Sequence, residues 1–71
     1  MEWHAIERDW DRYVASAKRQ WAKLSEEQIR ATRGRRKVLS ARLGEAYGLN
    51  ESETEAQLRE WQSLQANREH R

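Results

Sequence analysis

Proline is absent from this chain of 71 residues, and glycine occurs only at Gly34, Gly44 and Gly48. Proline breaks helices and glycine weakens them, so their scarcity leaves long stretches of backbone free to be helical. Alanine, glutamate, arginine, glutamine and leucine are abundant, whereas β-branched residues are few. The sequence therefore predicts an all-α protein, and its length allows one domain that spans residues 1–71.

Apolar residues recur every three or four positions, which predicts helices near residues 3–24, 25–32, 35–47 and 51–66. Two pairs of polar residues are spaced to cap helix starts, namely Ser25 with Gln28 and Asn50 with Glu53. In each pair the first side chain can accept from a backbone amide while the second reaches back. A helix should therefore begin at each pair.

Two of the glycines fall between expected helices. Gly48 is placed to end its helix in a left-handed conformation, which costs glycine little. Gly34 is the expected hinge, and the sequence leaves open whether it breaks the helix or bends it. Because the connections are so short, the helices cannot all lie parallel. We therefore expect a small four-helix domain built from two roughly orthogonal helical hairpins.

Most aromatic residues lie on the apolar stripes of these helices, which is typical of a core and not of a ligand-stacking surface. The residues expected to be buried together are Trp10, Trp21, Leu39, Leu43, Tyr47, Leu58 and Trp61. Val38 and Leu64 are assigned to the same stripes. Trp3 and Ile6 extend the first stripe past the length that the other helices can cover. We favour a monomer, with a weak homodimer contact through Trp3 and Ile6 as the alternative.

No constellation for catalysis, cofactor binding or metal binding stands out in the sequence. The two histidines, His4 and His70, lie at opposite ends of the chain, and each has one neighbouring acid where zinc requires three or four ligands. Ser25 is explained as a helix cap, and the acids lack the paired arrangement that general acid–base catalysis needs. The sequence thus predicts a protein that is not an enzyme and has no catalytic, cofactor or metal site.

The chain contains no cysteine, so packing must supply stability without disulfides or thiolate metal sites. Its first residues include Glu2 and Glu7 where a signal peptide would need an apolar segment. The polar face of the first helix mixes acids with bases, unlike a helix that lies on a membrane surface. We therefore expect a cytoplasmic protein that does not associate with membranes.

Positive charge is concentrated in one segment. Residues 30–44 carry six basic side chains and no acidic one, whereas the net charge is −1 over residues 1–29 and −3 over residues 45–71. We call these six residues the basic block: Arg30, Arg33, Arg35, Arg36, Lys37 and Arg42. Arginine suits phosphate because its planar guanidinium donates two parallel hydrogen bonds. The basic block is therefore the candidate binding site for a polyanion or an acidic protein.

Two interpretations of the basic block remain open. Arg30, Arg33 and Lys37 would share one helix face if the helix ran on through Gly34, and such a face would attract phosphates. The alternative is a solvated face that the acidic residues of the final helix partly neutralise. The absence of interleaved aromatic residues and the net charge of only +2 favour the solvated face.

A set of aromatic, glycine and leucine positions recurs at the spacing of a known family. They are Trp10, Tyr13, the run from Gln20 to Glu27, Gly34-Arg35-Arg36, Leu39, Leu43, Tyr47-Gly48 and Trp61. This pattern spans about residues 9–62 without a gap and resembles the CsbD-like family of small bacterial stress-response proteins. Arg33 and Lys37 stand where that family commonly has an acid, so the basic block is denser here.

The resemblance implies a four-helix, SAM-domain-like fold and production under general stress, and the family has no assigned catalytic residues. It thus predicts a non-enzymatic bacterial general stress-response protein of unassigned activity, with an interaction or protective role. The alternative is weak, sequence-independent nucleic-acid binding through the basic block, within residues 30–42.

Overall fold

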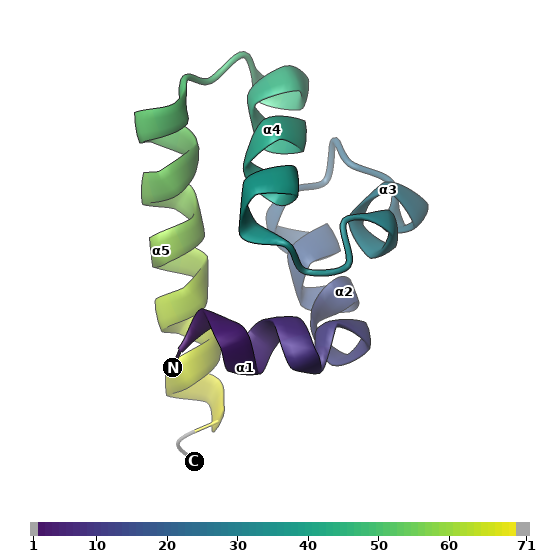
Figure 1. The fold of residues 1–71 in the computed structure, drawn as a ribbon, viewed down its shortest axis with the longest axis vertical. Helices are drawn as coiled ribbons and strands as arrows, with labels where there is room; N and C mark the ends of the chain where they lie inside the picture. Colours follow the sequence, from purple (N-terminus) through teal and green to yellow (C-terminus); the bar gives the residue numbers. More distant parts are fainter. Residues whose placement is uncertain (1, 70–71) are drawn as a thin grey trace.

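The computed structural model describes residues 2–69 of the chain, with side chains up to residue 66, as a helical domain (Figure 1). Its helices are α1 (Trp3–Arg8), α2 (Trp10–Gln20), α3 (Glu26–Ala31), α4 (Arg36–Tyr47) and α5 (Glu51–Glu69). No strand occurs among the described residues. The prediction of an all-α protein is confirmed, with five helices in place of the expected four.

The helices pack mainly in two pairs, α2 with α3 and α4 with α5. Figure 1 shows α4 and α5 side by side, joined by a short connection, with α1 crossing near the lower half of α5. A side-chain contact agrees with this crossing, because the rings of Trp3 and Trp61 lie 5.8 Å apart between centroids. The more detailed comparison with a SAM domain stays a prediction.

The prediction of a single helix over residues 3–24 is wrong. The helix is interrupted at Asp9, and its second part ends at Gln20. Asp9 has φ −112° and ψ 37°, outside the helical region, and it separates α1 from α2. Beyond Gln20, the Lys18 ammonium donates to the carbonyls of Ala22 and Leu24 at 3.0 and 2.8 Å, which ties the connection after α2 back to the helix. The break lets α1 turn back over the core.

The helix is interrupted at Gly34 and is not merely bent there, so α3 and α4 are separate helices. Both Arg33, at φ 56°, and Gly34, at φ 75°, are left-handed. A Cβ atom on Gly34 would lie only 3.0 Å from the Cα atom of Glu7 in α1. Glycine is therefore required both for its conformation and for the close approach of α1. Because of the break, Arg30, Arg33 and Lys37 do not share one continuous helix face.

The core forms around Trp61. Its ring centroid lies 5.4 Å from that of Trp21, 6.0 Å from Trp10 and 6.2 Å from Tyr13. The predicted burial of six residues is confirmed, namely Trp10, Trp21, Leu39, Leu43, Leu58 and Trp61. Tyr47 is only half-buried, although it packs against this core. Aromatic contacts of this kind supply much of the apolar area in a domain with so few residues.

Two residues assigned to the apolar stripes are instead exposed, Val38 at 38% and Leu64 at 45%. On α5 the buried positions are Thr54, Leu58, Trp61 and Gln65, which recur at helical spacing. Gln65, 5% exposed, accepts from the Ser16 hydroxyl and donates to the Trp61 carbonyl, both at 3.2 Å. The buried stripe thus continues through Gln65, and α5 extends beyond the expected end at residue 66.

Trp3 and Ile6 are covered within one chain. Ile6 is fully buried, and the Trp3 indole N–H donates to the Gly34 carbonyl at 2.8 Å. The Arg36 guanidinium lies over the Trp3 ring at 5.0 Å from its centroid. These contacts occupy the apolar surface that suggested a homodimer contact. Self-association stays a prediction, but the contacts that Trp3 and Ile6 make within one chain remove the reason for it.

Candidate functional site

Arg36 is the most embedded member of the basic block. Its side chain is 25% exposed, and its guanidinium donates to Glu55 at 3.0 Å and to Gln62 at 3.1 Å. The same guanidinium stacks over Trp3. Arg36 therefore ties α4 to α5 and α1, and its charge is already engaged. It belongs to the framework of the fold and not to an open binding surface.

Arg30 and Arg42 are also paired, although on the surface. Arg30 contacts Asp11 at 3.1 Å and Glu26 at 3.4 Å, and Arg42 contacts Glu45 at 3.2 Å. Such exposed pairs contribute at most about 1 kcal/mol each to stability. They do neutralise local charge, so neither arginine presents an uncompensated cation.

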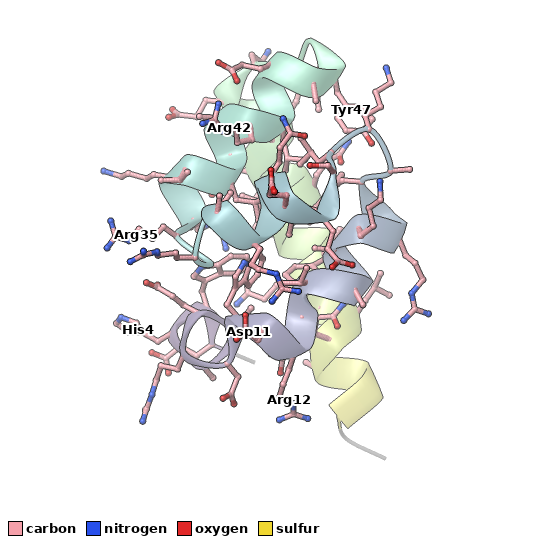
Figure 2. The ribbon with its side chains drawn as sticks, turned by 90° about the vertical axis from the view of Figure 1, so that its right-hand side faces the viewer. His4, Asp11, Arg12, Arg35, Arg42 and Tyr47 are labelled. Carbon is pink, nitrogen blue, oxygen red and sulfur yellow. The ribbon has the colours of Figure 1, made fainter. Side chains whose placement is uncertain are left out.

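The other three members of the basic block, Arg33, Arg35 and Lys37, are exposed. Within residues 2–69 their side chains make no hydrogen bond or ion pair. They follow one another along the turn between α3 and α4 and into the first turn of α4, and Arg35 projects from the edge of the molecule in Figure 2. We call these three residues the turn cations. They are the part of the basic block that remains free for a ligand.

The turn cations surround a helix start without a side-chain cap. The Ser25 and Gln28 pair that begins α3 forms the predicted reciprocal capping hydrogen bonds, at 3.0 and 2.9 Å. By contrast, Arg35 precedes α4 with no capping bond, and the first turn of α4 contains no acid. Positive side chains are unfavourable beside the positive end of a helix dipole. An anion here would be stabilised by both the side chains and the backbone.

The turn itself is held in a fixed conformation. The Thr32 hydroxyl donates to the Ile29 carbonyl at 2.7 Å and accepts from the Gly34 amide at 3.4 Å. The Arg35 amide donates to the Thr32 carbonyl at 3.0 Å. These bonds hold Arg33 at φ 56°, a left-handed conformation that costs a residue with a Cβ atom roughly 1–2 kcal/mol. The chain therefore tolerates strain at one of the turn cations.

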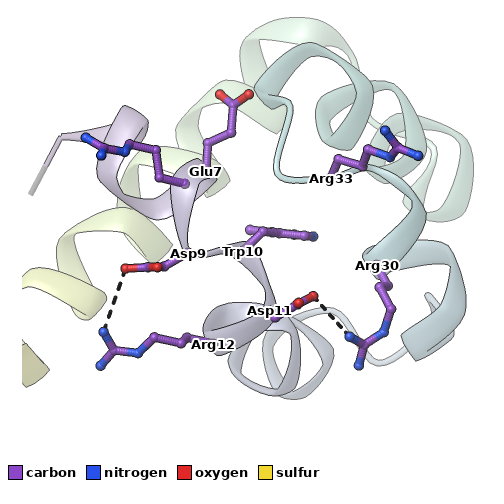
Figure 3. A pocket seen from close by; sticks show the side chains of 8 residues that line it. Glu7, Asp9, Trp10, Asp11, Arg12, Arg30 and Arg33 are labelled. Atoms are coloured by element: carbon purple, nitrogen blue, oxygen red, sulfur yellow. Dashed lines mark hydrogen bonds and ion pairs between the residues drawn. The ribbon is translucent and has the colours of Figure 1, made fainter.

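Two neighbouring depressions lie where α1 meets this turn. One, of about 460 Å³, is shown in Figure 3, where Arg30 pairs with Asp11 and Arg12 with Asp9. The other, of about 720 Å³, is lined by Arg8, Arg33 and Arg35 among others. Arg8 lies outside the basic block, and sequence reasoning missed it because only the fold brings α1 beside the turn.

Within residues 2–69, no group of three or more histidines, cysteines, aspartates or glutamates could hold a metal ion. His4 lies on α1, and His70 falls outside the described residues. In the same range, every buried side-chain nitrogen or oxygen has a hydrogen-bond partner. None of the described helices is both long and apolar enough to span a bilayer. The surface around the turn cations is therefore the candidate site.

The chain is similar to a UPF0337 protein from the bacterium Pectobacterium atrosepticum, with 30% identical residues over 54 positions. The aligned region covers 76% of this chain and 78% of that protein. No family model matches the chain. No solved structure matches it either.

Proposed function

The chain belongs to the UPF0337 family of CsbD-like proteins, and from that relationship we propose that it is a non-enzymatic bacterial stress-response protein that acts through noncovalent contacts. We expect an interaction or protective role exerted through the surface, since the aromatic residues around Trp61 are committed to the core. We place the protein in the cytoplasm, in keeping with its lack of cysteine. Its abundance in the bacterium that produces it, measured by mass spectrometry, should rise under general stress. Unchanged abundance under every stress would contradict this role.

A second candidate function is weak, sequence-independent binding of nucleic acid through the turn cations. The observation that carries it is that Arg33, Arg35 and Lys37 are exposed and unpaired among the described residues. Three phosphate contacts would give a slope of log affinity against log salt of about −2.7 on duplex DNA and about −2.1 on single strands. Residues 32–38, which carry these cations, contain no asparagine or glutamine, so base sequence would not be read.

Fluorescence anisotropy with labelled DNA and RNA over a salt series tests this second candidate. The variant Arg35→Glu/Lys37→Glu should lose binding, whereas Arg19→Glu/Arg59→Glu should retain most of it. Both double variants change the net charge from +2 to −2, so they separate the site from overall charge. Arg36 is kept because its reversal would disturb the contacts with Glu55 and Trp3.

Equal loss in the two double variants would mean that the turn is not a site. If the parent protein fails to bind any nucleic acid at low ionic strength, the second candidate is wrong. The partner should then be sought among acidic proteins. Circular dichroism of each variant would establish that the helices are retained.

A further inference from the structure

Cations from two distant parts of the sequence meet at one pocket. Arg8 comes from the end of α1, whereas Arg33 and Arg35 come from the turn before α4, and all three line the depression of about 720 Å³. Figure 2 shows His4 of α1 and Arg35 projecting on the same side of the molecule. The pocket therefore has one wall from α1 and another from the turn.

Positive charge exceeds negative charge in the lining of this pocket. Over residues 2–69, the side chains of Arg8, Arg33 and Arg35 take part in no ion pair or hydrogen bond. Glu2 and Glu7 also line the pocket, so its lining has a formal charge of +1 with His4 neutral. Because the lining carries a net positive charge, it attracts an anion.

The walls of the pocket are held in place by contacts that we described in the fold. The Trp3 indole donates to the Gly34 carbonyl at 2.8 Å, and Ile6 is fully buried beneath α1. At the meeting point, the Cα atom of Glu7 lies so near Gly34 that a Cβ there would be 3.0 Å away. The backbone of both walls is therefore fixed before any ligand arrives, and only the exposed arginine side chains must become ordered on binding.

We propose that this pocket binds a phosphate group, with Arg8, Arg33 and Arg35 as its binding residues. The inference rests on the proposed polyanion binding and extends that surface from the turn onto α1. Each arginine can donate two parallel hydrogen bonds to phosphate oxygens. The residues that line this pocket include no tryptophan or tyrosine on which a base could stack, and His4 supplies its one aromatic ring. The arginines therefore address the phosphate.

Two ligand sources share this chemistry, namely free phosphate compounds and the backbone of single-stranded nucleic acid. Nuclear magnetic resonance titrations with pyrophosphate and with a short single-stranded oligonucleotide distinguish them. The side-chain Nε–H signals of Arg8, Arg33 and Arg35 should shift on titration, whereas those of Arg19 and Arg59 should not. If pyrophosphate shifts the three signals and the oligonucleotide does not, the result supports a phosphate-binding pocket and contradicts nucleic-acid binding.

Single substitutions test the contribution of α1. Arg8→Ala should weaken binding of both probes about fivefold, while the matched control Arg19→Ala leaves it unchanged. Glu7→Gln should strengthen binding about twofold, because it removes a negative charge from the lining. Unfolding would weaken binding in both variants, so stronger binding by Glu7→Gln cannot be explained by unfolding.

Three results would overturn the inference. If Arg8→Ala binds as the parent does while Arg35→Glu/Lys37→Glu loses affinity, the pocket is wrong and binding at the turn stands. If shifts appear equally at Arg19 and Arg59, the anion binds without a site. If neither probe binds at low ionic strength, both the pocket and the polyanion binding are wrong.

Discussion

Replacing Arg33 by glycine should stabilise the protein while weakening its affinity for polyanions. Arg33 is left-handed at φ 56°, which costs a residue with a Cβ atom roughly 1–2 kcal/mol. Glycine removes that strain but adds about 0.5–1 kcal/mol of conformational entropy in the unfolded chain. The Arg33 side chain makes no ion pair or hydrogen bond among residues 2–69, so little else is lost. The free energy of unfolding should rise by about 0.5–1 kcal/mol.

Thermal unfolding followed by circular dichroism measures this gain. In a domain of this size, the expected increase corresponds to about 2–8 °C in Tm. Two controls remove the same charge: Arg33→Ala keeps the strain, and Lys37→Gly places glycine within α4, where it should cost up to about 1 kcal/mol. The reasoning is refuted if Arg33→Gly is no more stable than Arg33→Ala.

Three further predictions concern helix starts, the core and the glycines. Arg35→Asp supplies the missing cap of α4, so it should raise stability by about 0.5–2 kcal/mol and weaken polyanion binding; a lower Tm would contradict this. Trp61→Ala should cost roughly 3–5 kcal/mol and leave the chain largely unfolded, whereas the exposed Leu64→Ala should cost less than about 1 kcal/mol in urea titrations. Gly34→Ala should cost roughly 2–4 kcal/mol and Gly48→Ala about 1–2 kcal/mol, because a Cβ atom meets α1 only at Gly34; equal losses would argue against that close approach.

Local patterns predicted the capped helix starts and the end of α4 at Gly48, which is left-handed at φ 66°, but not the break at Asp9. The cap at Ser25 could be predicted because both of its partners lie within one helical turn. The same holds for Asn50, whose side chain accepts from the Glu53 amide at 2.9 Å. The break at Asp9 has no such signal, since the apolar stripe continues through it and no proline or glycine marks it. The break accompanies a tertiary contact, the hydrogen bond from the Trp3 indole to the Gly34 carbonyl, which sequence spacing does not reveal.

The composition of the site depended on contacts that sequence spacing does not reveal. The sequence does not reveal which members of the basic block are neutralised, whereas in the structure Arg36 pairs with Glu55 from α5 and Arg30 pairs with Asp11 from α2. Arg8 joins the site only because α1 folds back. Charge density in a segment indicates where cations are, whereas the fold decides which of them are neutralised.

The position of Trp61 has a consequence for synthesis on the ribosome. The side chains of Trp3, Trp10, Tyr13 and Trp21 are all made before this ring, yet each packs against it. A nascent chain that has not released α5 from the exit tunnel therefore carries four aromatic side chains without their common partner. Domains usually fold as units, so this one should fold late and in a single step during translation. A ribosome that stalls before residue 61 would release an unfolded fragment for proteases and not a partly working domain.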